Sequence, residues 1–261
     1  MTLTTIAAVF YLASSFLIYK RLKNQQSTSR WISLTPVLLA LIIHTLVLNS
    51  QIYQPDGLNL GLLTAASLIA WLVCIQILLS SIYRPLESLG IIMFPLSAIL
   101  MMLSQWVPSI HIVALQAGQL LQSHIMLSVV AYSLLMLAVL QAILLSVQDH
   151  ALRAHHPGGI IRFMPPMHDM ETLLFQMLGF AFLFLSTALI SGFIFLDDLF
   201  AQHLVHKTVL SIIGWFILAI LLFGRFRFGW RGKSAVRWTI ASFFFLMLAY
   251  FGSKLVLEFI I

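Results

Sequence analysis

Residues 122–147 read QSHIMLSVVAYSLLMLAVLQAILLSV, a run without one charged side chain. At about 1.5 Å per residue, a helix over this run covers roughly 39 Å, more than the roughly 30 Å hydrocarbon core of a bilayer. The run lacks the polar and apolar alternation of a membrane β-strand and is about twice as long as such a strand needs to be. It therefore predicts a membrane-spanning helix.

The rest of the chain has the same character. Hydrophobic residues make up 61% of it, charged residues only 8%, and the mean hydropathy is +1.02. So few charges cannot coat a soluble domain. We expect an all-α, polytopic transmembrane helix bundle of about eight helices, forming a single domain over residues 1–261. The first run is predicted to be a retained helix and not a signal peptide, because its basic residues follow it. The expected spans are about 3–19, 32–52, 59–81, 88–105, 122–147, 171–196, 208–224 and 238–257.

Basic residues divide unevenly between the two sides of this eight-span arrangement. Twelve of the 14 Lys and Arg residues fall on one side, and only Lys207 and Lys254 fall on the other. Because basic loops stay in the cytoplasm, the split places both termini and the loops near Asp56, His111 and Asp197 outside. The net charge of +6 is therefore a topology signal. We expect contact with the lipid bilayer and no nucleic-acid partner.

Several chemistries find no support in the sequence. The single Cys74 lies in the third span, where one thiol cannot form an internal disulfide or a CxxC redox pair. The chain has no Walker loop, no GxGxxG and no HExxH, and it has no pair of carboxylates at helical spacing. Proton pumps and cation transporters place carboxylates within their spans, and none is clearly present here. We therefore expect a binding protein with no catalytic residues, and not an enzyme.

Two histidines, His44 and His124, lie inside otherwise apolar spans. An ionisable group in hydrocarbon is costly and marks a candidate functional site, and neutral imidazole is a common ligand of metals and haem iron. The expected topology puts both in the outer half of the membrane, with His44 about 12 Å from the outer end of its span. Ser128 and Tyr132 follow His124 at four-residue steps and share its helix face. The alternative is that each histidine is hydrogen-bonded to a neighbouring helix.

The outer loop between the sixth and seventh spans adds further candidates. His203 and His206 are three residues apart, so they would share a face if this loop were helical. Together with His111 they are compatible with a haem held at the outer surface. They are equally compatible with ordinary interfacial residues.

The longest polar break, about 148–170, lies on the predicted cytoplasmic side and is rich in His and Pro. Its length suits a docking surface and is too short for a domain. The adjacent His155 and His156 raise the possibility of a metal site. No Cys or carboxylate completes a recognisable ligand spacing around them.

The sequence from His124 through Ser128 to Tyr132 resembles the His-Ser-Tyr helix of the cytochrome c assembly superfamily, whose haem-handling members include the CcsA and CcmC proteins. The resemblance covers about residues 120–257, and the first hundred residues are similar only in being helical. Further segments match in order and spacing: Met164-Pro165-Pro166, Met170 to Leu174, Ser191-Gly192, Lys207 followed by Trp215, Gly229-Trp230-Arg231-Gly232, and Tyr250-Phe251-Gly252.

Two departures narrow the resemblance. The stretch Phe193 to Val205 contains no Trp, whereas haem-presenting members carry a tryptophan-rich motif there. The seventh and eighth spans contain no histidine. The chain is thus most similar to the YpjD and HemX-like branch. That resemblance implies a multi-pass protein of the bacterial inner membrane, linked to cytochrome complex assembly and haem binding.

For the site, the resemblance implies a haem ligand at His124, while His44 enters on the physical argument alone. Two neutral imidazoles would give a low-spin, six-coordinate iron in an apolar pocket. Tyr132, Ser128 or Tyr250 would hydrogen-bond to a propionate or orient an imidazole, and Lys207 or Lys254 would offset propionate charge. The expected cofactor-binding residues are His124, His44, Tyr132, Ser128, His206 and His203, with the first two as iron ligands.

Two other functions stay open. The protein could be a transporter or its accessory subunit, although sparse intramembrane carboxylates count against this reading. It could also be a regulatory membrane scaffold that binds a soluble enzyme through the 148–170 and 225–237 loops. The HemX-like resemblance makes a haem-biosynthesis enzyme the natural partner of a scaffold, and cytochrome c assembly proteins the natural partners of a haem-handling protein.

Overall fold

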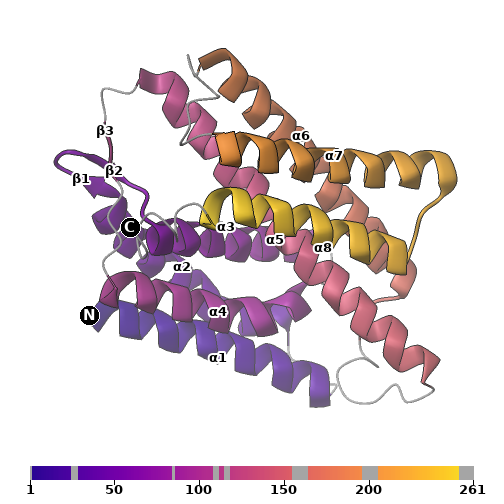
Figure 1. Ribbon diagram of the computed structural model, residues 1–261. Helices are drawn as coiled ribbons and strands as arrows, with labels where there is room; N and C mark the ends of the chain where they lie inside the picture. The colour runs from indigo at the N-terminus through magenta and orange to yellow at the C-terminus, as the bar shows by residue number, and fades with distance from the viewer. Residues whose placement is uncertain are drawn as a thin grey trace. The chain divides into compact units, whose positions relative to one another are not determined.

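The computed structural model describes residues 2–24, 29–83, 86–107, 112–114, 118–154, 164–195 and 205–252. These residues form eight helices that are long and apolar enough to cross a membrane, which confirms the predicted all-α, polytopic architecture (Figure 1). A small antiparallel sheet, which the sequence did not predict, joins two of the connections. The helices are α1 Thr2–Asn24, α2 Arg30–Ile52, α3 Leu62–Tyr83, α4 Glu87–Trp106, α5 Gly118–Arg153, α6 Met167–Phe195, α7 Val205–Phe228 and α8 Lys233–Met247.

Most helices extend beyond the apolar runs that predicted them. Helix α5 begins at Gly118 and ends at Arg153, where Arg153 Nε lies 2.9 Å from Asp149 Oδ1 one turn earlier. A helix of this length covers about 54 Å, so it continues beyond the hydrocarbon core. Helix α8 begins at Lys233, five residues before the expected start, and passes into a π-helical turn over Leu248–Gly252.

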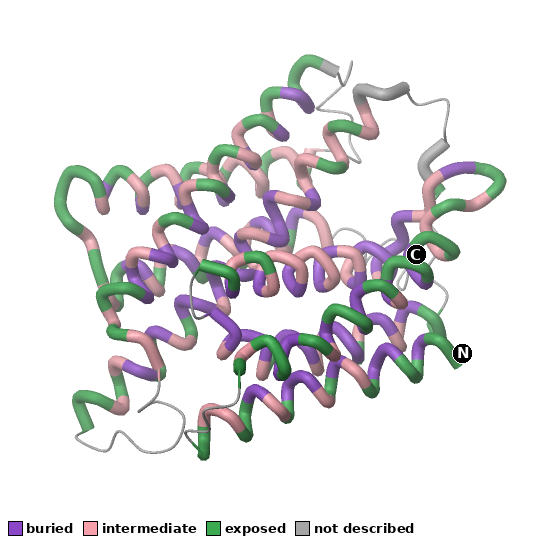
Figure 2. Tube along the Cα trace, turned by 180° about the vertical axis from the view of Figure 1, so that it is seen from behind, coloured by how far each residue is buried: buried purple, intermediate pink, exposed green. Residues whose placement is uncertain are grey.

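The first four helices and the three strands belong to one compact unit. Helix α1 packs against α2 and α4, and α3 packs against the same two helices, so the four form a closed ring of neighbours. The buried side chains of α1 recur at steps of three or four residues, at Ala7, Tyr11, Ser14 and Ile18. Figure 2 shows the resulting pattern of buried and exposed turns along each helix.

The sheet fixes which connections of this unit lie together. Its strands are β1 Tyr53–Gln54, β2 Gly57–Asn59 and β3 Ile112–Ala114, in the order β1-β2-β3. Strand β2 pairs with β3 through Leu58 and Val113, so the connection after α2 lies beside the connection after α4. Alternating membrane spans put these two connections on the same side, as the sequence predicts. That this side is the outer one stays a prediction.

Helices α5 to α8 belong to the second compact unit. Helix α5 packs against α6 and α8, and α7 packs against the same two, which repeats the closed ring of the first unit. The backbones of α7 and α8 approach closely at Gly214, whose carbonyl accepts a hydrogen bond from Ser242 Oγ at 2.8 Å. A Cβ at Gly214 would lie 2.6 Å from Leu246 Cγ, so only glycine fits without a shift.

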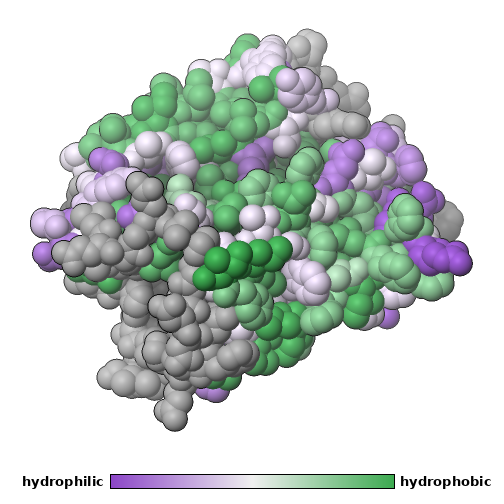
Figure 3. Space-filling model, turned by 90° about the horizontal axis from the view of Figure 1, so that it is seen from above, coloured by the Kyte–Doolittle hydropathy of each residue, from purple (hydrophilic) through white to green (hydrophobic). Residues whose placement is uncertain are grey.

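The surface of the helices is apolar, as a lipid environment requires. Large hydrophobic side chains are more than half exposed on helices of both units, among them Phe16, Ile42, Met126, Phe180 and Phe216. Figure 3 shows hydrophobic residues over most of the coloured surface. Apolar exposure on this scale marks a membrane or an interaction surface. The chain is a multi-pass membrane protein, and its organisation as a single domain stays a prediction.

Candidate functional site

His44 lies at the centre of the first unit, and both of its ring nitrogens are hydrogen-bonded. The residue is 0% exposed. Its Nδ1 lies 3.0 Å from the Tyr11 hydroxyl, and its Nε2 lies 2.9 Å from Ser67 Oγ. The Tyr11 ring meets the imidazole edge-on, with 5.9 Å between the ring centroids. His44 therefore joins α1, α2 and α3 through hydrogen bonds at both of its ring nitrogens.

The hydrogen-bonded cluster around His44 extends toward the only cysteine. The Tyr11 hydroxyl also lies against the Cys74 thiol. Cys74 Sγ is 3.0 Å from Ser97 Oγ on α4, which also reaches the Ala70 carbonyl at 3.4 Å. Buried polar groups stabilise a bundle when each has a partner. The polar side chains at the centre of the first unit thus satisfy one another.

His124 lies near the start of α5 in the second unit and is only half-buried. Its Nδ1 is 2.9 Å from the Ala188 carbonyl oxygen and 3.0 Å from Ser191 Oγ, both on α6. Ser191 Oγ itself donates to the Ala188 carbonyl at 2.8 Å. Because a carbonyl only accepts, the proton of a neutral imidazole resides on Nδ1, and Nε2 keeps its lone pair. Within the described ranges, Nε2 has no hydrogen-bond partner.

A glycine on α6 makes room for this imidazole. A Cβ at Gly192 would lie 3.1 Å from His124 Cε1, 3.5 Å from Nδ1 and 4.0 Å from Nε2. The first of these distances is tighter than an ordinary van der Waals contact, so any larger residue would displace the ring. Ser191 therefore forms a hydrogen bond with His124, and the neighbouring Gly192 leaves room for its ring.

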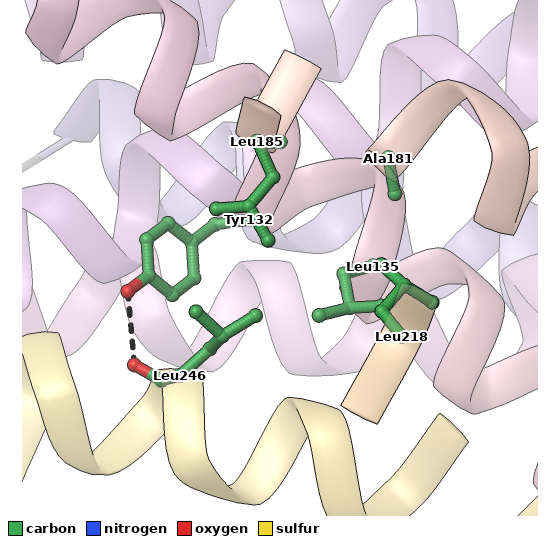
Figure 4. A pocket seen from close by; sticks show the side chains of 7 residues that line it. Tyr132, Leu135, Ala181, Leu185, Leu218 and Leu246 are labelled. Carbon is green, nitrogen blue, oxygen red and sulfur yellow. Dashed lines mark hydrogen bonds between the residues drawn. The ribbon is translucent and has the colours of Figure 1, made fainter. Parts of the chain in front are cut away.

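Ser128 and Tyr132 share the face of His124 but donate their hydroxyl protons to backbone carbonyls. Ser128 Oγ donates to the His124 carbonyl at 2.8 Å. Tyr132 donates to the Leu246 carbonyl on α8 at 2.9 Å, as the dashed line in Figure 4 shows. Its ring also packs against Tyr250 in the π-helical turn, with 5.8 Å between centroids. These contacts make Tyr132 a tie between α5 and the end of α8.

The pocket beside Tyr132 is apolar and too narrow to hold a water molecule. The side chains labelled in Figure 4 come from α5, α6, α7 and α8. The pocket is lined by Ala131, Tyr132, Leu135, Ala181, Leu185, Leu218 and Leu246. It is part of the packed interior of this unit.

The remaining sequence candidates lie at the start of α7 or outside the described residues. His206 lies in the first turn of α7 and is exposed, and Lys207 beside it is half-buried. His203 and His111 lie outside the described residues, as do Lys254 and the adjacent histidines of the 148–170 break. In the part of the chain that the structure describes, no three His, Cys, Asp or Glu residues come close enough to hold a metal ion.

The sequence reasoning did not identify the partners of His124. Ala188 contributes its backbone carbonyl, which no side-chain pattern can reveal. Ser191 and Gly192 stand out in the sequence only through the family resemblance. Trp215, noticed in the same way, donates through Nε1 to Ser186 Oγ at 2.8 Å and stacks on Phe182. These contacts all join α6 to a neighbouring helix, so only packing shows them.

Comparisons with known proteins identify the family of the chain. The family model described as "Cytochrome C assembly protein" matches residues 31–261, so the similarity includes α2 to α4 as well as the second half. The inner membrane protein YpjD of Escherichia coli strain K12 is 31% identical over 259 residues, covering 98% of this chain and 97% of that protein.

Two more distant relatives match about half of the chain. An uncharacterized 28.8 kDa protein of Azospirillum brasilense is 31% identical over 137 residues, which are 52% of this chain and 51% of that protein. The cytochrome c biogenesis protein CcsA of Chlamydomonas reinhardtii is 23% identical over 147 residues, 56% of this chain and 40% of that protein. No solved structure matches the chain significantly. The chain belongs to the cytochrome c assembly family.

Proposed function

We propose that this chain is a haem-binding protein of the bacterial inner membrane, related to cytochrome c assembly, in which His124 Nε2 would hold the haem iron. The observation that carries the proposal is the difference in hydrogen bonding between the two ring nitrogens of His124. Nδ1 is held by the Ala188 carbonyl and Ser191 Oγ, while Nε2 keeps a lone pair. Metal-ligating histidines almost always donate their other ring N–H in this way, which fixes the tautomer and orients the ring.

The donor set fits haem better than a metal ion bound by protein ligands alone. A structural or catalytic metal site needs three or four protein ligands, and the described residues offer no such cluster. In haem, the porphyrin supplies four nitrogen ligands to the iron, so the protein needs to supply only one or two. One oriented imidazole at the end of an apolar helix meets that requirement. When bound, haem supplies a redox-active iron.

The roles of the surrounding residues follow from their contacts. Ser191 orients the imidazole, Gly192 leaves space beside it, and Tyr132 holds α5 against the end of α8. His44 is not a ligand in this proposal, because a bond to iron would break one of its two buried hydrogen bonds. The protein binds haem and turns over no substrate. Without tryptophans from Phe193 to Val205, it lacks the aromatic platform for presenting haem at its surface.

The test is the absorption spectrum of the protein purified in detergent from haem-supplemented cells. We expect a Soret band with α and β bands in the parent protein, and their loss in His124→Ala. His150→Ala is the matched control, because His150 is an exposed histidine at the other end of the same helix. Added imidazole should restore the spectrum of His124→Ala by occupying the vacated position. A colourless parent protein, or a His124→Ala variant that keeps the full spectrum, would overturn the proposal.

A further inference from the structure

The turn between α7 and α8 carries an unusual concentration of cations and aromatic rings. Residues 225–233 read RFRFGWRGK, in which basic and aromatic side chains alternate around two glycines. Figure 2 shows most of this turn as exposed. In Figure 1 the turn connects α7 to α8 at the right of the view.

The backbone of the turn is held in a defined conformation. Gly229 and Gly232 have φ angles of +66° and +54°, in the left-handed region that favours glycine. The Gly229 N–H bonds to the Arg225 carbonyl at 3.1 Å and ends α7. The Gly232 N–H donates to Glu171 Oε1 on α6 at 2.8 Å. The turn is therefore fixed to a third helix.

Side-chain packing adds to this support. The Trp230 ring lies over Gly224, where a Cβ would come within 2.4 Å of the ring, and it packs on Trp238 with 5.5 Å between centroids. Arg225 donates to the Trp230 carbonyl at 3.2 Å, and its guanidinium lies 4.5 Å from the centre of the Phe175 ring. Arg225 is therefore committed to holding the turn.

The other basic residues of the turn, together with Arg237 one turn into α8, give this end of the helix pair a positive surface. Arg231 Nε lies 3.7 Å from Glu171 Oε2, which is the one carboxylate paired with the turn among the described residues. Arg227, Lys233 and Arg237 are exposed and make no ion pair or side-chain hydrogen bond within the described part of the chain. Glu171 already accepts from Gly232 and Arg231, so the surface keeps a net positive charge.

Exposed aromatic side chains lie beside these cations. Phe226 is 91% exposed and Phe228 is 67% exposed. Both lie at the end of a membrane-spanning helix, where an apolar Phe ring can bury at the boundary between acyl chains and headgroups. Cations at the same depth meet the phosphates of lipid headgroups, and those of anionic lipids attract them most strongly.

From this arrangement we infer that the α7–α8 turn is a binding site for the headgroup phosphate of an anionic phospholipid. Arg227, Lys233 and Arg237 supply the charge, and the rings of Phe226 and Phe228 insert beside the acyl chains. The expected ligand is a lipid because the turn connects the ends of two membrane spans. Lipid headgroups therefore surround it at high local concentration. The site is independent of the proposed haem ligand.

The test measures phosphatidylglycerol binding to delipidated, detergent-purified protein by native mass spectrometry, with phosphatidylcholine as the neutral comparison. The variant is Arg227→Gln/Lys233→Gln/Arg237→Gln. We expect its affinity for phosphatidylglycerol to fall roughly a hundredfold, because each cation near the membrane surface contributes a factor of about ten or less. Lys20→Gln/Lys23→Gln/Arg30→Gln removes the same charge from the same predicted side and should change the affinity less than about threefold.

Further measurements separate a lipid site from general charge attraction. Phe226→Ala/Phe228→Ala keeps every cation and should still weaken phosphatidylglycerol binding. Inorganic phosphate should not displace the lipid, since it lacks acyl chains. Circular dichroism checks that each variant remains helical. Equal losses in the two triple variants, equal binding of both lipids, or displacement by inorganic phosphate would overturn the inference.

Discussion

The two compact units use their intramembrane histidines in opposite ways. In the first unit, His44 is fully buried and both ring nitrogens are hydrogen-bonded to side chains of neighbouring helices. In the second unit, His124 is half-buried, with Nδ1 bonded to α6 and Nε2 without a partner among the described residues. The difference teaches that a histidine in a membrane span becomes a ligand candidate only when its helix contacts leave one nitrogen free.

The units also differ in what brings their helices together. The first is joined at its centre by buried hydrogen bonds between polar side chains, such as that between Cys74 Sγ and Ser97 Oγ. The second adds close approach at small residues, with Gly214 between α7 and α8 and Gly192 between α5 and α6, to interhelical hydrogen bonds such as that from Tyr132 to the Leu246 carbonyl. Polar side chains and small residues are the two common means of helix association in membranes.

The largest expected effect comes from removing the centre of the first unit. His44→Leu leaves the Tyr11 and Ser67 hydroxyls without their imidazole partner, which should cost about 2–3 kcal/mol of unfolding free energy. Denaturant titration in detergent measures this loss, with the exposed His150→Leu as the control. The haem spectrum of the folded fraction should persist. A fully stable His44→Leu variant that is colourless would reverse the roles assigned to the two histidines.

Substitution at the close approach of the second unit should have the next largest effect. Gly214→Ala places a methyl group 2.6 Å from Leu246 Cγ, so α7 and α8 must separate. We expect a loss of about 1–2 kcal/mol, typical of overpacking. Gly179→Ala is the matched control, because a Cβ there has no atom within 4 Å, and it should be neutral or slightly stabilising. Equal behaviour of the two variants would contradict the role of Gly214.

A smaller effect is expected when the space beside His124 is filled. In Gly192→Ala the new methyl group lies 3.1 Å from His124 Cε1, so the imidazole must shift by a few tenths of an ångström from its present position. Haem affinity should fall roughly tenfold, as for other disturbances of ligand orientation. Haem titration of the apoprotein gives this value, and the unfolding free energy without haem should change by less than about 1 kcal/mol. Unchanged affinity would show that Gly192 does not shape the site.

The smallest effect should follow the loss of one of two partners of His124. Ser191→Ala removes the hydroxyl at 3.0 Å from Nδ1 and leaves the Ala188 carbonyl at 2.9 Å. Because the carbonyl still fixes the tautomer, we expect haem affinity to fall only about threefold, below the usual range for such partners. A shift in the reduction potential of bound haem would accompany it. A loss as large as that of His124→Ala would mean that Ser191, and not Ala188, sets the tautomer.

Much of the fold follows from local properties of the sequence. The eight spans were predicted to within a few residues at most ends, because hydrophobic length alone decides whether a segment crosses a bilayer. Three boundaries were less accurate, and the first is the end of α1, which continues to Asn24. Helix α5 runs past its apolar stretch into polar residues that favour a helix equally well, and α8 begins at Lys233 after the left-handed Gly232.

By itself, the sequence determined the class of protein, the number of spans and the presence of His44 and His124 inside them. Only the tertiary structure decided which histidine keeps a free nitrogen. Their hydrogen-bond partners lie 23 to 67 residues away along the chain and come from other helices. Hydropathy is a property of each segment, whereas the hydrogen bonding of an imidazole depends on which neighbours helix packing brings to it.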